Sequence, residues 1–313
     1  MIYLISFVIL SLLALGYLKL ADHFNIIDKP NLRSSHTIPT IRGGGIVFYF
    51  GLLVFFVYSR FDYPYFLGAV TVIAAVSFMD DLKPLGRKLR LFFHFIAGIA
   101  LLYQLQVFSH DWWLVPLYLI FIVGFFNLFN FMDGINGLTG LYSLAVLSGF
   151  LWLNTVQPII HYDLIYLSMI SVLVFGFFNF RNKARWFAGD IGSMTMASIL
   201  IFLFGAFFFT YEAPVLILLF VVYGVDGGLT ILLRALRMEN ITDAHRHHLY
   251  QKFVDVGKWS HLHVSLVYAT TQVLVNIVVV QCIELPMVYQ WMAVAGVVTL
   301  LSVAYFSLVR YFK

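Results

Sequence analysis

The stretch VPLYLIFIVGFFNLFNFMDGING, residues 115–137, decides the fold class of this chain of 313 residues. Its first half is apolar and belongs to an apolar run, residues 113–130, that approaches the roughly 20 residues needed for one bilayer crossing. Its second half carries Asn127, Asn130 and Asp133 at intervals of three, so a helix presents them on one face. The stretch therefore predicts a membrane-spanning helix that ends in a cluster of oxygen-rich side chains.

This polar cluster has two interpretations. A polar group in hydrocarbon costs free energy unless it has a partner or a task. Carboxylate and amide oxygens suit a hard cation with its phosphate ligand, whereas asparagine side chains also hydrogen-bond between packed helices. The sequence Asp133-Gly-Ile-Asn136-Gly137 that follows favours the cation site, because so many polar groups exceed what helix packing needs.

The composition extends the prediction of membrane helices to the whole chain. Hydrophobic residues make up 62%, charged residues 11%, and the mean hydropathy is +0.92, whereas soluble proteins carry about a quarter charged residues. We expect one all-α, polytopic domain over residues 1–313, embedded in the bilayer and without nucleic acid as a partner. The single Cys282 excludes an internal disulfide and a cysteine-based metal site. The roughly 11 predicted spans are 2–20, 43–59, 64–80, 91–108, 113–130, 137–154, 162–180, 191–210, 214–234, 262–282 and 287–309.

The positive charges predict the orientation. Of the 19 Lys and Arg residues, all except Arg60 fall on one side of the predicted spans, and such residues collect on the cytoplasmic side. The N-terminus is therefore predicted outside and the C-terminus in the cytoplasm. The longer loops would then all be cytoplasmic: about residues 21–43, 80–91, 130–137, 181–191 and 235–261.

Two of these loops indicate phosphate and proton chemistry. Basic and hydroxyl side chains lead into Gly43-Gly-Gly45, and backbone N–H groups at such a helix start bind phosphate, although a positively charged hinge is an alternative. Asp80 and Asp81 end a predicted span, where adjacent carboxylates repel each other unless a cation is close. That pattern suits a general base beside a metal or a basic clamp, and a solvated helix end is the alternative.

Three further features carry charge. Asp190, between Gly189 and Gly192, is either a helix N-cap or a metal ligand that needs close backbone approach. The segment His245-Arg-His-His248 suits an anion clamp better than a transition metal, with a solvated basic loop near lipid head groups as the alternative. Asp226 lies inside a span, two turns from Arg234, and a buried ion pair between them would support the site.

Five segments in this order carry a family resemblance: His36 to Gly44, Asp80-Asp81, Asn127 to Gly137, Gly189 to Ser193, and His245 to Gln251. Together they resemble the polyprenyl-phosphate N-acetylhexosamine-1-phosphate transferases of glycosyltransferase family 4, over essentially the whole chain. That family includes the translocase for the first lipid intermediate of peptidoglycan and the enzymes that start O-antigen. The last segment is more similar to the O-antigen branch, which uses UDP-N-acetylhexosamines, 6-deoxy sugars among them.

The resemblance implies transfer of a sugar 1-phosphate from a UDP-N-acetylhexosamine to undecaprenyl phosphate, with release of UMP. It implies Mg²⁺, with Mn²⁺ as an alternative, and a site on the cytoplasmic side of the bacterial inner membrane, in pathways such as lipopolysaccharide biosynthesis. A cation and basic groups would offset the repulsion between two phosphates. Direct attack is favoured over an aspartyl intermediate.

Residue roles also follow from the resemblance. Asp190 would be the main metal ligand, with Asn130 near or on the ion. Asp80 would take the proton from the lipid phosphate, with Asp81 supporting it or positioning a lysine. The implied catalytic residues are Asp80, Asp81 and Asp133, the metal ligands Asp190 and Asn130, and the substrate-binding residues Thr40, Lys83, Asn127, Asn136, His245, Arg246 and His247.

Departures and rival functions leave some questions open. Asn136 stands where many family members have Asp, which leaves the nucleotide-sugar contacts and the choice of UDP-sugar open. His94 stands where Gln is common, which leaves the subfamily open. A prenyltransferase would require Asp-x-x-x-Asp repeats, which Asp80-Asp81 does not supply. A transporter or flippase for an anionic lipid would place ionisable groups near the bilayer midplane, where only Asp226 is expected. The sequence leaves the oligomeric state open, with a homodimer as one alternative.

Overall fold

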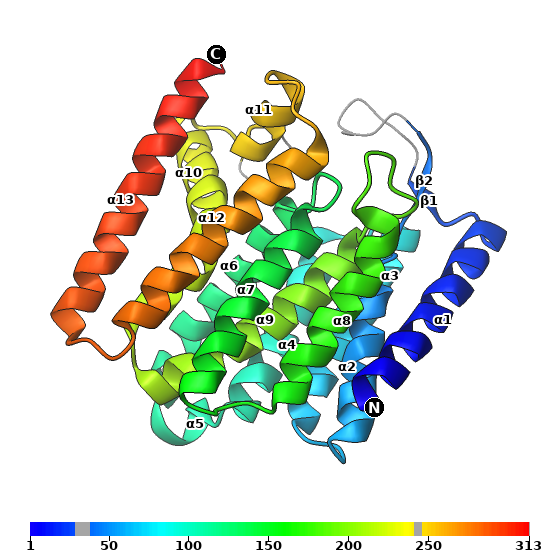
Figure 1. The fold of residues 1–313 in the computed structure, drawn as a ribbon, viewed down its shortest axis with the longest axis horizontal. Coiled ribbons are helices and arrows are strands. Elements are labelled where there is room, and N and C mark those ends of the chain that lie inside the picture. Colours follow the sequence, from blue (N-terminus) through cyan, green and yellow to red (C-terminus); the bar gives the residue numbers. More distant parts are fainter. Residues whose placement is uncertain (29–37, 241–245, 313) are drawn as a thin grey trace.

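The computed structural model describes residues 1–28, 38–240 and 246–312, which form a bundle of helices (Figure 1). Long helices run up and down the bundle, and the two chain termini lie at its opposite ends. The predicted all-α membrane fold class is confirmed. The elements are α1 (Ile2–His23), β1 (Ile27–Asp28), β2 (Thr40–Ile41), α2 (Ile46–Tyr58), α3 (Pro64–Leu82), α4 (Arg87–Gln104), α5 (Val107–His110), η1 (Trp112–Leu114), α6 (Val115–Phe131), α7 (Leu138–Val156), α8 (Tyr162–Asn179), α9 (Gly189–Tyr211), η2 (Pro214–Phe220), α10 (Val221–Leu236), α11 (Leu249–Asp255), α12 (His261–Cys282) and α13 (Met287–Tyr311).

The predicted spans coincide with helices, but not all of these helices have the dimensions of a bilayer crossing. Within the described residues, nine helices are long and apolar enough to span a membrane. Helix α2 has only 13 residues, and α4 carries Arg87, Lys88 and Arg90 in its first turn. The total number of crossings and the orientation therefore stay predictions.

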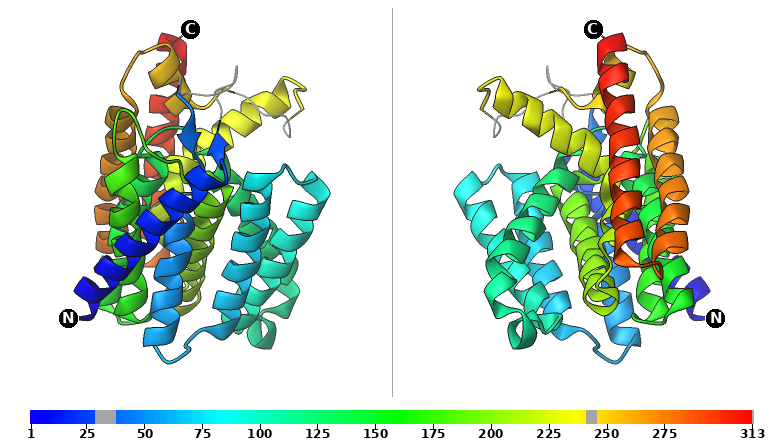
Figure 2. Two further views of the ribbon diagram at one scale, coloured as in Figure 1. Left: turned by 90° about the vertical axis from the view of Figure 1, so that its right-hand side faces the viewer. Right: turned by 90° about the vertical axis from the view of Figure 1, so that its left-hand side faces the viewer.

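Helix α9 forms the centre of the bundle and α13 lies at its edge (Figures 1 and 2). In the most apolar part of α9, 83% of the residues are buried, against 6% in α13. A helix that is apolar on all sides suits a central position. The first half of α9 also contains the small residues Gly192, Ser193, Ala197 and Ser198, which let neighbouring helices approach closely.

A hydrogen-bonded junction joins the start of α2 to the start of α9. Strand β2 pairs with β1 and also bridges to Trp186. The Gly44 N–H donates to the Phe187 carbonyl at 2.8 Å, and the Gly45 N–H to the Ala188 carbonyl at 3.0 Å. These two amides bind protein carbonyls and so do not serve as the phosphate site that the glycine run suggested.

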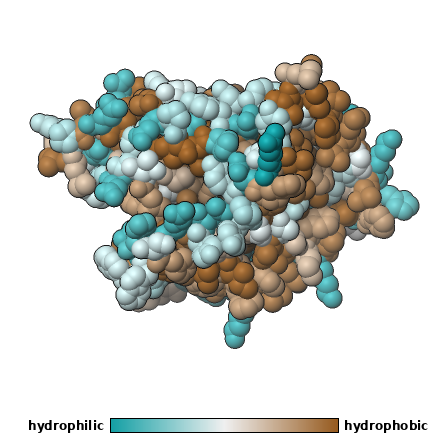
Figure 3. Space-filling view, turned by 90° about the horizontal axis from the view of Figure 1, so that it is seen from below, coloured by the Kyte–Doolittle hydropathy of each residue, from teal (hydrophilic) through white to brown (hydrophobic). Residues whose placement is uncertain are grey.

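The end of the bundle opposite the C-terminus has a mixed surface. Seen from that end, apolar side chains cover much of the surface around groups of hydrophilic ones (Figure 3). Trp112 and Trp113, in η1, and Trp291, in the first turns of α13, are largely exposed. Exposed tryptophans near helix ends are typical of the boundary between hydrocarbon and head groups.

The junction between α2 and α9 provides a test of this packing. A Cβ atom on Gly45 would lie 2.2 Å from the Cα of Gly192 and 2.8 Å from the Ala188 carbonyl oxygen, whereas a Cβ on Gly68 would meet nothing within 4 Å. We expect Gly45→Ala to lower the apparent unfolding temperature of the detergent-purified protein, since overpacking costs about 1–3 kcal/mol. Gly68→Ala is the matched control and should melt like the wild type. Equal melting of both variants would contradict the close packing.

Candidate active site

Asp81, near the end of α3, holds the start of α9. Its side chain is 0% exposed. One carboxylate oxygen accepts the Asp190 N–H at 2.9 Å and the other accepts the Ile191 N–H at 3.1 Å. These amides belong to the first turn of α9, where backbone donors have no partner inside the helix. Asp81 therefore caps α9 from another helix, and the Nε of Arg42 lies 2.6 Å from the same carboxylate.

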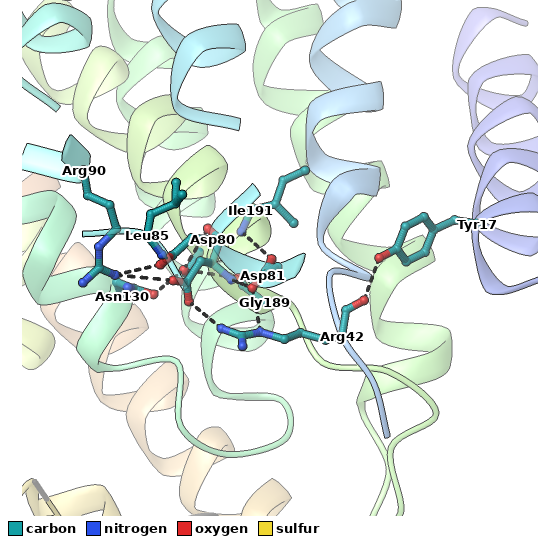
Figure 4. Close-up of polar contacts among 11 residues, drawn as sticks. Tyr17, Arg42, Asp80, Asp81, Leu85, Arg90, Asn130, Gly189 and Ile191 are labelled. Atoms are coloured by element: carbon teal, nitrogen blue, oxygen red, sulfur yellow. Dashed lines mark hydrogen bonds and ion pairs between the residues drawn. The ribbon is translucent and has the colours of Figure 1, made fainter. Parts of the chain in front are cut away.

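Because Asp81 supplies the cap, the carboxylate of Asp190 faces the site instead. Its oxygens lie 3.2 Å from Arg42 Nη2 and 3.7 Å from Arg90 Nη1. Arg90 Nη1 also lies 2.9 Å from Asp80 Oδ2, and Asp80 is within hydrogen-bonding reach of Asp190. The interpretation of Asp190 as an N-cap is therefore wrong. Figure 4 shows Arg42 directed toward Asp81 and Arg90 directed toward Asp80, at the end of α3.

Asn130 joins the cluster from α6. Its Oδ1 accepts a hydrogen bond of 2.8 Å from the hydroxyl of Ser193, which lies one turn after Asp190 on α9. The structure thus brings together Asp80, Asp81, Asn130 and Asp190, which come from three helices that are far apart in the chain, and their catalytic and metal-binding roles stay predictions.

The oxygen donors at this site fit a hard divalent cation. Two carboxylates as close as those of Asp80 and Asp190 repel each other unless a positive group offsets the charge, and Arg90 does so here. Among the residues that the structure describes, no three His, Cys, Asp or Glu side chains gather into a metal site. Mg²⁺ commonly takes only one or two protein carboxylates and fills its remaining positions with phosphate oxygens and water. The donor set is of that kind.

Asp133 lies beside this cluster, in the turn between α6 and α7. Its Oδ1 accepts a hydrogen bond from the Thr139 hydroxyl at 2.5 Å. Burial raises the pKa of Asp133 to about 6, against the opposing effect of the Thr139 hydrogen bond, and the nearby Asp81 carboxylate raises it further. A carboxyl group that titrates near neutral pH in such a place is suited to exchanging a proton.

Two of three further predicted substrate-binding residues make local contacts, and the third is exposed. Thr40 is buried and its hydroxyl donates to the Ile38 carbonyl at 2.9 Å. Lys83 is exposed just beyond the end of α3. The Nδ2 of Asn127 donates to the Val123 carbonyl, one turn earlier in α6, at 2.7 Å. None of these contacts joins them to the carboxylate cluster, and their substrate roles stay predictions.

Asn136 connects three segments near the site. It is 5% exposed, and its Nδ2 donates to the carbonyls of Arg181 at 3.0 Å and Asn182 at 3.3 Å. Its own carbonyl accepts the Ser265 hydroxyl at 2.9 Å. The side chain thus supports the loop between α8 and α9, and its predicted contact with the nucleotide sugar stays a prediction.

The side chains of the basic segment before α11, residues 246–248, lie in different surroundings. Arg246 binds both carboxylate oxygens of Asp255, at 2.7 and 3.1 Å. His247 is half exposed, whereas His248 is 2% exposed beside a carboxylate of α10. Because the two imidazoles lie in different surroundings, they do not share one transition metal ion. His245 lies outside the described residues.

The sequence did not single out two residues that complete the cluster. Arg42 and Arg90 were counted only among the loop cations that set the orientation, yet their guanidinium groups contact all three carboxylates. Adjacent carboxylates such as Asp80 and Asp81 need a nearby cation, and this requirement could have pointed to an arginine at the site. Tyr17 of α1 positions Arg42 by donating its hydroxyl to the Arg42 carbonyl at 2.6 Å.

Comparison with known proteins bears on this cluster. A family model matches residues 63–208, just under half of the chain. It describes glycosyl transferase family 4. The matched region contains Asp80, Asp81, Asn130, Asp133 and Asp190. The match supports a membrane-embedded transferase of the general kind that moves sugar phosphates onto polyprenyl phosphate. No curated protein matches the chain.

The raised pKa of Asp133 predicts a pH effect on stability. Because the folded-state pKa of about 6 lies above the ordinary value of 3.8, the folded protein binds this proton more tightly than the unfolded chain. The stabilisation is complete below the ordinary value and is lost as the pH rises through the folded-state pKa. We therefore expect Asp133→Asn to reduce the fall in unfolding temperature between about pH 4 and pH 7, measured in detergent with a chelator.

The matched control for this measurement is Asp22→Asn, because Asp22 is an exposed acid on α1. It should keep the wild-type pH dependence. A wild-type pH dependence in Asp133→Asn as well would show that this carboxyl group does not have the assigned pKa.

Proposed function

We propose that this protein transfers an N-acetylhexosamine 1-phosphate from a UDP-N-acetylhexosamine to undecaprenyl phosphate at the cytoplasmic face of a bacterial inner membrane. The observation that carries the proposal is the convergence of Asp80, Asp81 and Asp190 with Arg42 and Arg90 at one end of a membrane bundle. Soluble and lipid-bound phosphates would meet at such a place. The match to glycosyl transferase family 4 supports the same general chemistry.

The proposed reaction forms one phosphorus–oxygen bond and breaks another. An oxygen of the lipid phosphate attacks the sugar-bearing phosphorus of the UDP-sugar, and the bond from that phosphorus to the UMP oxygen breaks. The products are the lipid diphosphate sugar and UMP. Phosphoryl transfer depends mostly on positioning and on charge stabilisation. The guanidinium groups of Arg42 and Arg90, already held beside the carboxylates, supply positive charge where two anionic phosphates must approach.

We assign a divalent cation, Mg²⁺ or Mn²⁺, to Asp190 and Asn130. The Asp190 side chain is 20% exposed, and Ser193 orients the Asn130 amide oxygen. When bound, the ion would offset charge on the diphosphate. Asp190 gains access to the site because Asp81 performs the capping that the start of α9 requires.

Asp80 and Asp81 receive different roles in this proposal. Asp80, 8% exposed, is assigned to accept the proton of the lipid phosphate beside Arg90. Asp81 is enclosed and both its oxygens accept backbone N–H groups, so it positions α9 and Arg42 rather than a lysine. These engaged carboxylates support direct attack by the lipid phosphate, since an aspartyl intermediate would have to break the same hydrogen bonds.

The nucleotide sugar is assigned to the wall formed by the turn after α6 and the segment before α11. Asp133 lies in that turn, and Arg246 and His247 provide groups for the diphosphate. Which N-acetylhexosamine is used, 6-deoxy sugars included, and whether the product starts an O-antigen follow from the resemblance alone. The rival role as a lipid transporter has less support, because the charged cluster lies where α3 ends and where α4 and α9 begin rather than midway along these helices.

The proposed reaction predicts exchange of labelled UMP into a UDP-N-acetylhexosamine. Purified protein with undecaprenyl phosphate and Mg²⁺ should catalyse this exchange, and a chelator should stop it until Mg²⁺ is restored, because the diphosphate charge is then uncompensated. A panel of UDP-sugars would identify the donor. Absence of exchange with every UDP-N-acetylhexosamine tested would argue decisively against the reaction.

The assignment of Asp190 predicts a selective loss of activity. Asp190→Asn should reduce exchange by roughly a thousandfold or more, since it removes charge from the site of phosphoryl transfer, while the protein still inserts and folds. Asp22→Asn, which changes an exposed acid on α1, should exchange at the wild-type rate. Wild-type turnover by Asp190→Asn would overturn the metal assignment.

A further inference from the structure

Asp226 is a buried carboxylate that the proposed reaction does not use. It lies in α10 and is 2% exposed. A charge in such a place is costly unless several partners compensate it. The sequence suggested Arg234 as the partner, but the structure joins Arg234 to Glu239 at 2.9 Å. Asp226 must therefore be compensated by other groups.

The partners of Asp226 come mainly from the start of α11. Its Oδ1 accepts the Leu249 N–H at 2.8 Å, and its Oδ2 accepts the Tyr250 N–H at 3.3 Å. The Tyr268 hydroxyl, on α12, donates to the same Oδ2 at 2.6 Å. Leu249 and Tyr250 are the first two residues of α11, whose amides need partners outside the helix. Asp226 therefore caps α11 from within the bundle.

Helix α11 in turn contacts the edge of the active site. The Tyr250 hydroxyl donates to the Phe131 carbonyl, at the end of α6, at 3.0 Å. A Cβ atom on Gly134 would lie 2.1 Å from that hydroxyl, so only glycine allows the contact. Phe131 follows Asn130 directly, and Asp133 is two residues further on. Through Tyr250, the capped end of α11 thus rests on the segment that carries these two residues.

The same end of α11 also carries the basic segment. Arg246 to His248 immediately precede Leu249, and Arg246 binds Asp255, the last residue of the helix. This ion pair ties the basic segment to α11. A helix of seven residues does not hold its place by itself, so the location of Arg246 depends on what anchors α11.

We propose that Asp226 is a positioning residue for the nucleotide-sugar site. By capping α11, it holds Tyr250 against the end of α6, and with α11 it holds the adjoining basic segment of residues 246–248. The inference rests on the proposed function, which assigns Arg246 and His247 to the diphosphate of the UDP-sugar. It predicts that Asp226 determines affinity for the donor sugar and not for the lipid acceptor.

The test compares Asp226→Asn and Tyr268→Phe with Tyr162→Phe in the full-length protein. Tyr162→Phe is the matched control, because the Tyr162 hydroxyl, on α8, donates to the Asn154 carbonyl at 2.7 Å and contacts neither Asp226 nor α11. Hydrogen–deuterium exchange is measured over residues 249–253, with α9 as an internal reference. UMP exchange supplies kcat and the KM values for the UDP-sugar and for undecaprenyl phosphate.

For Asp226→Asn we expect at least about tenfold faster deuterium exchange in α11 and about a tenfold higher KM for the UDP-sugar, the effect of losing one good hydrogen bond. The acceptor KM and kcat of Asp226→Asn should stay within about threefold of the wild type. For Tyr268→Phe, the deuterium exchange rate of α11 and the donor KM should lie between those of the wild type and those of Asp226→Asn. Tyr162→Phe should match the wild type.

Unchanged deuterium exchange in α11, or an unchanged donor KM, would overturn the proposal, as would equal effects on donor and acceptor. If Asp226→Asn does not fold, Tyr268→Phe decides by the same criteria. Failure of the wild type to exchange UMP would refute the proposed function separately, and deuterium exchange would still decide whether Asp226 holds α11.

Discussion

The enclosed carboxylate of Asp81 holds together segments that lie more than a hundred residues apart in the chain. It accepts two amides at the start of α9 and lies 2.6 Å from the Nε of Arg42. A buried charge is tolerated only when such partners surround it. Because this one carboxylate caps α9, the neighbouring Asp190 does not have to, and its side chain is directed to the two arginines. The arrangement of the whole site follows from that division of roles between two acids.

The glycines around Asp81 make this division sterically feasible. Gly189 has a positive φ of 71°, and a Cβ atom there would lie 2.6 Å from Asp81 Oδ2 and 2.8 Å from the Gly43 nitrogen. Any side chain at this position would displace either the cap or the backbone that carries Arg42. The glycine-rich segments are therefore required for close packing between the start of α2 and the start of α9, and the carboxylate of Asp190 lies beside that contact.

Asp226, like Asp81, is a buried carboxylate that caps the start of a helix other than its own. Each of the two carboxylates lies on one helix and caps another, Asp81 the long α9 and Asp226 the short α11. In a bundle where water is scarce, orphan amides at helix starts and buried carboxylates satisfy each other. Both caps also hold residues assigned to substrates: Asp190 in the first turn of α9, and Arg246, which binds Asp255 of α11. The buried carboxylates of Asp81 and Asp226 thus position the helix starts that carry the charged residues of the site.

The sequence by itself determined the all-α membrane fold and the approximate extent of the long helices, and it singled out Asp80, Asp81, Asn130 and Asp190, which the structure brings together. The length of an apolar run and the cost of a polar group in a membrane are local properties of a chain, so they follow from the sequence without knowledge of tertiary contacts. Only the tertiary structure decided that Asp81 rather than Asp190 caps α9, that Arg42 and Arg90 compensate the acids, and that Asp226 binds α11 rather than Arg234. In each case the chain offers several partners of suitable charge. The partner that a side chain binds depends on which helix ends lie within hydrogen-bonding distance, and the packing of small residues sets those distances.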